Sequence, residues 1–192
     1  MTSGRVTKIY YFDDKGPVNT DKTLDIALDC CKERNIKKIV VASSTGETAL
    51  KLHGKAPTEI DIIAVTYSAG SRFTEDVEKF LEKQDEIMAK GIAIVRGMHS
   101  LSGTERAFQN KYKTGMIPLN IVADSLRMFC HGVKVCVEIA IMAAEAGHII
   151  PDEKVVVVAG SHKGADTAVV LKPAYAANMF ETKIGPLLCM PS

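Results

Sequence analysis

The sequence has no tryptophan, few aromatic residues and almost no net charge. Aromatic residues make up 6% of its 192 residues, and the formal net charge is +1 at pH 7. Bases stack on aromatic side chains, and both nucleic acid and acidic membrane surfaces attract proteins that carry excess positive charge. We therefore expect a protein that binds neither nucleic acid nor a membrane.

Long apolar runs are also absent. No segment approaches the roughly 18 consecutive apolar residues that a membrane-spanning helix requires. The N-terminal stretch MTSGRVTKIYYFDD does not combine a positive segment, an apolar segment and a cleavage site, as a secretory signal does. Both observations predict a soluble, cytoplasmic protein.

Cysteine occurs five times, but without a pattern that indicates cross-links or a metal site. The number is odd, two of the residues are adjacent, and no pair has the spacing C-x-x-C. A disulfide framework and a zinc site both need paired spacings. We expect buried or half-buried thiols in a reducing compartment, and no bound metal. The five are Cys30, Cys31, Cys130, Cys136 and Cys189.

What the sequence does contain is an alternation of short apolar runs and amphipathic segments. The expected strands are 6–12, 37–42, 60–66, 92–95, 154–159, 167–171 and 187–190. The expected helices are 20–34 (capped by Thr20 or Asp21), 49–54 or slightly beyond, 74–90, 118–131 and 133–146, with 97–115 as a longer loop or broken segment. Short connections with right-handed crossovers imply a doubly wound sheet. We predict a single α/β domain over residues 1–192, a three-layer sandwich with a mostly parallel central sheet.

The first candidate site lies directly between the strand at 37–42 and the helix that follows it. It consists of Ser43, Ser44, Thr45, Gly46, Glu47 and Thr48. Hydroxyls and backbone amides at a helix N-terminus, where the helix dipole is positive, can cradle a phosphate. A glycine there lets the backbone approach a ligand closely. The loop is not a nucleoside triphosphatase motif, and its structural alternative is an ordinary Ser/Thr helix cap.

Three later strand ends carry similar small polar loops. The carboxyl ends of parallel strands share one edge of the sheet, which is where open α/β sheets bind ligands. We therefore predict that these loops line one pocket with the first, although each alone could be a simple polar turn. The predicted residues are Thr66, Ser68, Ala69 and Gly70 in the second loop; His99, Ser100, Ser102 and Gly103 in the third; and Gly160, Lys163, Gly164, Asp166 and Thr167 in the fourth, which also includes His162.

Several of these side chains have a specific candidate role. His99 could act as an acid or base, and the alternative is a loop histidine with no catalytic role. Lys163 could pair with a phosphate, and Asp166 could bind a sugar hydroxyl. Lys134 and Glu138 interrupt an apolar helix at i,i+4 spacing, which predicts an internal ion pair of a kind that is more often structural than catalytic.

The stretch Lys38–Thr66, KIVVASSTGETALKLHGKAPTEIDIIAVT, resembles the C-terminal domain of pyruvate kinase. In that domain a strand leads into a Ser/Thr-Gly-x-Thr loop, a helix and a strand ending in I-x-A-V-T. The later VVVVAG, Val155–Gly160, resembles the closing hairpin of the same domain, so the likeness covers most of residues 37–171.

The resemblance implies a fold and a ligand class. In many pyruvate kinases this loop grips a phosphate of a sugar bisphosphate effector, so Ser43, Ser44, Thr45, Gly46 and Thr48 would be the matching phosphate contacts. The catalytic barrel is absent, so pyruvate kinase activity is not expected. The chain looks like a stand-alone member of this group, and the resemblance suggests flavin mononucleotide (FMN) as a ligand.

The leading hypothesis is a binding or regulatory domain for a phosphorylated small molecule, with FMN as the first candidate. One alternative is an enzyme, either a flavin-dependent oxidoreductase or a phosphosugar-acting enzyme that uses His99 and Lys163. Another is a protein–protein interaction module. The apolar helix at 133–146 needs cover, which self-association into a homo-oligomer or burial within one chain would supply equally well.

Overall fold

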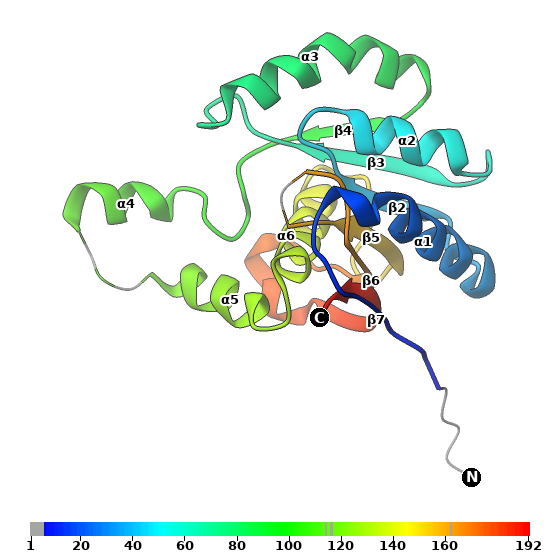
Figure 1. Cartoon of the computed structure of the whole chain (residues 1–192). Coiled ribbons are helices and arrows are strands. Elements are labelled where there is room, and N and C mark those ends of the chain that lie inside the picture. The colour runs from blue at the N-terminus through cyan, green and yellow to red at the C-terminus, as the bar shows by residue number, and fades with distance from the viewer. Residues whose placement is uncertain (1–5, 114, 116, 162) are drawn as a thin grey trace.

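A seven-stranded sheet forms the centre of the computed structural model, which describes residues 6–192 except 114, 116 and 162 (Figure 1). The strand order across the sheet is β1-β7-β6-β5-β2-β3-β4. Every neighbouring pair is parallel except the two that involve β6, which runs antiparallel to β5 and β7. The mostly parallel sheet predicted from the sequence is confirmed. The strands are β1 (Tyr10–Phe12), β2 (Lys38–Ala42), β3 (Asp61–Thr66), β4 (Ala93–Arg96), β5 (Val155–Ala159), β6 (Thr167–Lys172) and β7 (Lys183–Pro191).

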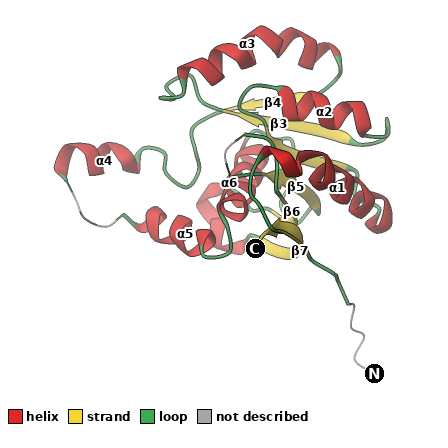
Figure 2. Ribbon diagram, in the orientation of Figure 1, coloured by secondary structure: helices red, strands yellow, loops and turns green. Residues whose placement is uncertain are grey.

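Helices cover both faces of the sheet, so the architecture is a three-layer α/β sandwich (Figure 2). The α1, α2 and α3 helices pack on one face, whereas α6 packs on the other face and α5 packs against α6. The helices are α1 (Thr20–Arg34), α2 (Glu47–Lys55), α3 (Thr74–Ala89), α4 (Glu105–Tyr112), α5 (Pro118–Arg127) and α6 (His131–Glu145), with 3₁₀ turns η1 (Pro17–Asn19) and η2 (Ala176–Glu181).

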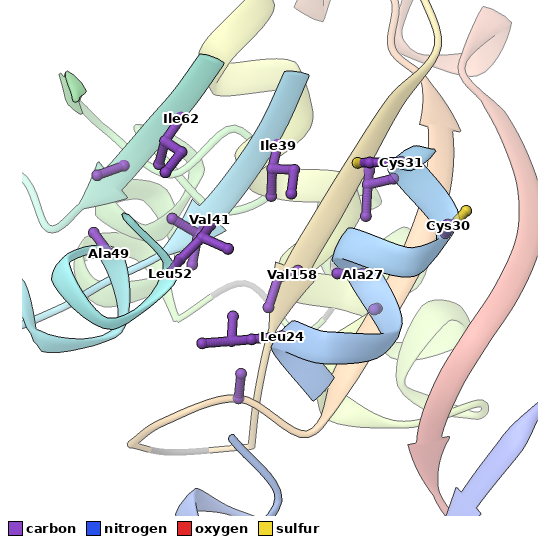
Figure 3. Packing of buried hydrophobic residues seen from close by; sticks show 14 of the residues in the cluster. Leu24, Ala27, Cys30, Cys31, Ile39, Val41, Ala49, Leu52, Ile62 and Val158 are labelled. Atoms are coloured by element: carbon purple, nitrogen blue, oxygen red, sulfur yellow. The ribbon is translucent and has the colours of Figure 1, made fainter. Parts of the chain in front are cut away.

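The central strand β2 shows why its sequence is continuously apolar. Ile39 and Val41 point to the α1 and α2 layer, where they meet Leu24 and Leu52 (Figure 3). Val40, between them, points to the opposite face and belongs to the α6 cluster. Successive side chains of a strand alternate between faces, so a strand covered on both sides needs apolar residues at every position.

The α6 helix is buried along nearly its whole length, as its all-round apolar sequence predicts. Its N-terminus is pressed against the start of β6. A side chain at Gly132 would collide with Thr167, because an added Cβ would lie 2.0 Å from the Thr167 hydroxyl oxygen. This close contact fixes the start of α6 at the edge where β2, β3, β4 and β5 end. The self-association proposed to cover this helix is therefore not required for its burial.

Four element predictions differ from the structure, one of them being the strand expected over 187–190, which begins earlier as β7 (Lys183–Pro191). The strand expected over 6–12 is only Tyr10–Phe12, and the longer loop or broken segment expected over 97–115 contains the regular helix α4. The helix expected over 118–131 ends at Arg127, and a new helix begins at His131. Thr20 is the first residue of α1 rather than its cap, because the N-cap is Asn19.

The Thr20 hydroxyl forms a hydrogen bond outside its own helix. It accepts a hydrogen bond from the backbone N–H of Ala165, at 3.0 Å, and so ties α1 to the turn between β5 and β6. In the part of the chain that the structure describes, no helix is both long enough and apolar enough to cross a membrane.

Candidate functional site

A cleft of about 1640 Å³ follows the edge of the sheet where the parallel strands end. Segments after β2, β3, β4 and β5 form its wall, together with the N-terminal turns of α2 and α3 and residues of α4 and α6. Small-ligand sites usually have volumes of roughly 300–1,000 Å³, so this cleft has room for a nucleotide-sized molecule. The four loops predicted from the sequence therefore meet at one place.

Most of the predicted site residues belong to the wall of this cleft. They come from all four loops, which lie far apart in the sequence and are brought together only by the sheet. They are Ser43, Ser44, Thr45, Glu47, Thr48, Thr66, Ser68, Gly70, His99, Ser102, Gly103, Gly160, Lys163 and Gly164. The predicted residues that the structure places outside the wall are Gly46, Ala69, Ser100, Asp166 and Thr167. His162, in the fourth loop, lies outside the described residues.

The bend between β2 and α2 presents a row of unused amides. The N–H of Ala49 donates to the Ser43 hydroxyl at 3.1 Å, and the N–H of Leu50 donates to the Gly46 carbonyl. Within the described chain, no hydrogen bond engages the N–H groups of residues 44–48. These amides lie at the positive end of α2 and beside the cleft, which is the arrangement that binds anions.

Neighbouring side chains hold this bend in place. The Thr66 hydroxyl at the end of β3 donates to the Ser44 carbonyl at 3.4 Å, and the Ser43 amide donates to the Val65 carbonyl at 3.0 Å. Ser43 is buried and acts as a side-chain acceptor for the helix, whereas Ser44 and Thr45 are half-buried in the cleft wall. The hydroxyls of Ser44 and Thr45 are therefore the ones placed to meet a ligand.

Gly46 is required for packing rather than for ligand approach. Its φ of +86° lies in the left-handed region that favours glycine. A Cβ at this position would lie 2.9 Å from Cδ1 of Ile87 on α3. The side of Gly46 on which a substituent would project thus faces α3 and not the cleft. The sequence pattern correctly singled out Gly46, but the contact that requires a glycine there is with Ile87, 41 residues further along the chain.

Positive charge dominates the cleft although the whole chain is nearly neutral. Six basic side chains line it against three carboxylates. Four of the basic side chains form no salt bridge with any described residue, whereas Lys51 and Lys134 each do; the four are Arg72, Lys79, Arg106 and Lys163. Such an excess of cations favours an anionic occupant. The six are Lys51, Arg72, Lys79, Arg106, Lys134 and Lys163, and the three carboxylates are Glu47, Asp76 and Glu138.

The carboxylate nearest the bend, that of Glu47, forms a salt bridge with a lysine. Glu47, the first residue of α2, pairs with Lys83 of α3 at 3.0 Å. The hydrogen bond from Lys83 lowers the pKa of Glu47, and the charges of Lys83, Lys163 and Lys79 lower it further. Lys163 therefore lies within electrostatic reach of the start of α2, as its candidate role of phosphate partner requires.

A second cluster of charges forms another part of the wall. Glu138 of α6 is 1% exposed and accepts hydrogen bonds from His99 Nδ1 at 2.9 Å and from Lys134 Nζ at 2.6 Å, both at Oε2. Its Oε1 accepts the backbone N–H of Leu101 at 3.3 Å. The Ser100 hydroxyl donates to the backbone carbonyl of Glu138 at 3.0 Å. The i,i+4 ion pair predicted from the sequence is confirmed, and it also fixes the third loop.

These contacts keep Glu138 ionised. Burial is the largest influence on its pKa and acts to raise it. The hydrogen bond from His99 and the charge of Lys134 together outweigh burial and lower the pKa of Glu138 to about 2. A carboxylate therefore persists inside the cleft wall throughout the neutral pH range.

Two aromatic side chains also line the cleft: Tyr67, within the predicted second loop at 66–70, and Phe73, which lies beyond it and was not predicted. The rings of Tyr67 and Phe73 stack with centroids 5.0 Å apart and planes inclined by 24°. Tyr67 also contacts the His99 ring at 6.0 Å, and the Arg72 guanidinium lies 5.0 Å from the centre of the Phe73 ring. A strand end followed by a Tyr-x5-Phe spacing gives no pattern from which this pairing could have been recognised.

Asp166 does not face the cleft, which corrects its proposed role as a ligand for a sugar hydroxyl. Its carboxylate is fully buried and accepts the backbone N–H groups of Gly16 at 2.8 Å and Ser161 at 3.2 Å. The Thr167 hydroxyl donates to it at 2.8 Å. The hydrogen bonds of Asp166 are thus made within the protein. Through Gly16 and Ser161 they join the N-terminal segment to the β5–β6 turn.

The cysteines form no part of the cleft wall. All five are free thiols, and four of them are buried. Burial raises the pKa of Cys31 and of Cys189 to about 12, so both are unreactive thiols at neutral pH. The expected buried thiols are confirmed. Among the residues that the structure describes, no cluster of His, Cys, Asp or Glu side chains has the makeup of a metal site.

Fold and cleft together define a class: a mostly parallel α/β protein with an anion-favouring cleft at the carboxyl ends of its strands. The sequence matches the family described as pyruvate kinase, alpha/beta domain, over residues 21–171. The chain belongs to this family, and the resemblance found in the sequence is confirmed.

Two solved structures are also similar to this chain. Pyruvate kinase of Cryptosporidium parvum in complex with ADP is 16% identical, with a TM-score of 0.40 over 82% of this chain and 24% of that chain. The NH3-dependent NAD synthetase of Campylobacter jejuni in complex with nitrate is 14% identical, with a TM-score of 0.42 over 74% of this chain and 55% of that chain. The present chain thus spans about a quarter of that pyruvate kinase.

Proposed function

We propose that this protein binds a phosphorylated small molecule, with its phosphate on the bend at residues 44–48 and its organic part along the cleft. The observation that carries the proposal is the row of unpartnered amides at the start of α2. FMN is the first candidate ligand, and the role is that of a ligand-binding or regulatory protein without pyruvate kinase activity.

The charges around the bend support a phosphate rather than a neutral group. A dianionic phosphate there would accept charge-assisted hydrogen bonds from the amides and from the hydroxyls of Ser44 and Thr45. Each such bond contributes about 1.5–3 kcal/mol to binding. Lys79 and Lys163 would add attraction without first breaking a salt bridge of their own.

The aromatic pair supports a flat organic group further along the cleft. Phe73 is 44% exposed and stacks on the half-buried Tyr67, so an apolar ring face is available at the wall. A planar heterocycle could cover that ring, since offset stacking of aromatic rings contributes about 0.5–1.5 kcal/mol beyond the burial of area. An isoalloxazine ring is one such heterocycle.

Affinity for FMN in the double variant Thr45→Ala/Thr48→Ala tests the proposal. We expect binding to weaken by roughly tenfold or more, because one charge-assisted hydrogen bond to the phosphate is lost. The measurement is titration calorimetry, run in parallel with riboflavin, which lacks the phosphate. Riboflavin should bind more weakly than FMN to the unmodified protein and equally to both proteins.

Thr58→Ala is the matched control, since Thr58 is exposed and precedes β3, at the opposite edge of the sheet. It should leave the affinity for FMN unchanged. An unchanged affinity in the Thr45→Ala/Thr48→Ala protein would show that the phosphate does not lie on this bend.

A further inference from the structure

Anion binding leaves one feature of the cleft unexplained: a carboxylate buried in its wall that is hydrogen-bonded to both Lys134 and His99. Lys134 and Glu138 lie one turn apart on α6, and both line the cleft. His99 reaches the same carboxylate from the loop after β4. A buried negative charge in the same wall does not strengthen the binding of a phosphate. The cluster of Glu138, Lys134 and His99 therefore needs a different explanation.

The contact with Glu138 determines which nitrogen of His99 carries the proton. Because the carboxylate stays ionised, it only accepts hydrogen bonds, and Nδ1 of His99 must be the donor. In the neutral imidazole the lone pair is then on Nε2. The His99 side chain is 36% exposed and lines the cleft, and no described residue forms a hydrogen bond with Nε2. A side chain that lines the cleft therefore carries a base with an unused lone pair.

Lys134 supplies a cation beside this base. Its side chain is 8% exposed, and its Nζ donates to Glu138. An ammonium has three N–H donors, and within the described residues the other two have no partner. A buried cation with unused donors stabilises an oxygen on which negative charge develops, because its attraction is poorly screened there.

We propose that His99 is the acid–base residue of this cleft and acts on a phosphorylated substrate that carries a carbonyl group, with Glu138 as a positioning residue. The proposal rests on the proposed function, because the phosphate on residues 44–48 would anchor the substrate. Nε2 takes a proton from the carbon next to the carbonyl, and the C–H electron pair becomes the enolate C=C bond. The carbonyl oxygen becomes the enolate oxygen, to which Lys134 donates. The same proton, or one exchanged with water, returns from Nε2 to carbon, so no other reactant is consumed.

Exchange of substrate hydrogen for deuterium measures this step directly. The protein is incubated in D₂O with dihydroxyacetone phosphate, a three-carbon phosphorylated ketone, and loss of the C–H signals is followed by proton NMR. We expect exchange above the protein-free rate, and His99→Gln should reduce that excess by roughly 100-fold or more. Dihydroxyacetone, which lacks the phosphate, should exchange far more slowly. His53→Asn, at the end of α2 and outside the cleft wall, is the matched control and should exchange as the unmodified protein does.

A second readout separates a positioning role of Glu138 from that of a purely structural ion pair. Nitrogen-15 NMR of the histidine rings should show His99 protonated at Nδ1 in its neutral form, and Glu138→Gln should shift its tautomer balance. A proton on Nε2 in the neutral form would overturn the proposal, as would unchanged exchange in the His99→Gln protein.

Binding measured on the same samples separates failure of this proposal from failure of the proposed function. If the protein binds FMN and dihydroxyacetone phosphate but exchanges no hydrogen, the acid–base role is wrong and the phosphate seat stands. If neither FMN nor inorganic phosphate binds, both proposals are wrong. If both bind and FMN suppresses the exchange by competition, the two sites belong to one cleft as proposed.

Discussion

At the scale of single residues, Glu138 shows how a charge can be kept in a core. Burying a carboxylate is costly unless its lone pairs are used. The Glu138 carboxylate accepts hydrogen bonds from Lys134 of α6 and from His99 and Leu101 of the loop after β4. The Ser100 hydroxyl donates a fourth hydrogen bond, to the backbone carbonyl of Glu138. The ion pair with Lys134 could be predicted from i,i+4 spacing. The contact with His99 could not, because it spans 39 residues and depends on the sheet.

Glu138→Gln tests this account through pH. The pKa of Glu138 falls from about 4.5 in the unfolded chain to about 2 in the folded one, so folding favours the ionised form. Its contribution of about 3 kcal/mol to stability is present above the unfolded pKa and is lost as pH falls toward 2. The stability difference between the natural protein and the variant should therefore shrink between pH 5 and pH 2, as urea unfolding at each pH would measure. A difference that stays constant over this range would contradict the assignment.

Gly46→Ala tests the contact between the bend and α3. The positive φ and the collision with Ile87 should together lower the free energy of unfolding by about 1–3 kcal/mol. Gly54→Ala, in α2 with open space around it, is a control of opposite sign and should stabilise by about 0.5–1 kcal/mol. The midpoints of urea denaturation give both values. Equal effects in the two variants would show that the bend does not need its glycine.

At the scale of elements, the predictable segments were those with a covered face. In apolar strands and amphipathic helices, the spacing of the apolar residues indicates which surface is buried. For this reason β2, β3, β5 and α3 were predicted to within a few residues. The α4 helix has no buried residue and so carries no stripe that points to a core. β1 is shorter than its composition predicts, since only Tyr10–Phe12 pair with β7.

The exposed α4 helix leads to a prediction about local stability. It has eight residues and projects from the body of the molecule (Figure 1). Isolated helices shorter than roughly 12–15 residues are marginal in water. The first tryptic cut within residues 20–190 should therefore follow Arg106, Lys111 or Lys113, as mass spectrometry of early fragments would show. An earlier cut after Arg72 or Lys163, in the other cleft loops, would mean that α4 is not the least stable element.

At the scale of the whole molecule, topology assembles the site. Loops separated by more than 100 residues in sequence meet because four strands run in the same direction and end at the same edge. That much follows from the alternation of strands and helices. The N-terminal half of α6 also lines this edge, and it carries Lys134 and Glu138. The sequence could not show this, since an apolar helix gives no sign of which end approaches the cleft.

The measurement that tests the central claim most directly is the response of individual backbone amides to a phosphate. In nitrogen-15 NMR spectra titrated with inorganic phosphate and then with FMN, we predict that the largest shifts common to both ligands fall on residues 44–48. Shifts of the Tyr67 and Phe73 region should appear with FMN alone. Common shifts at residues 131–134, at the start of α6, with none at residues 44–48, would contradict the account.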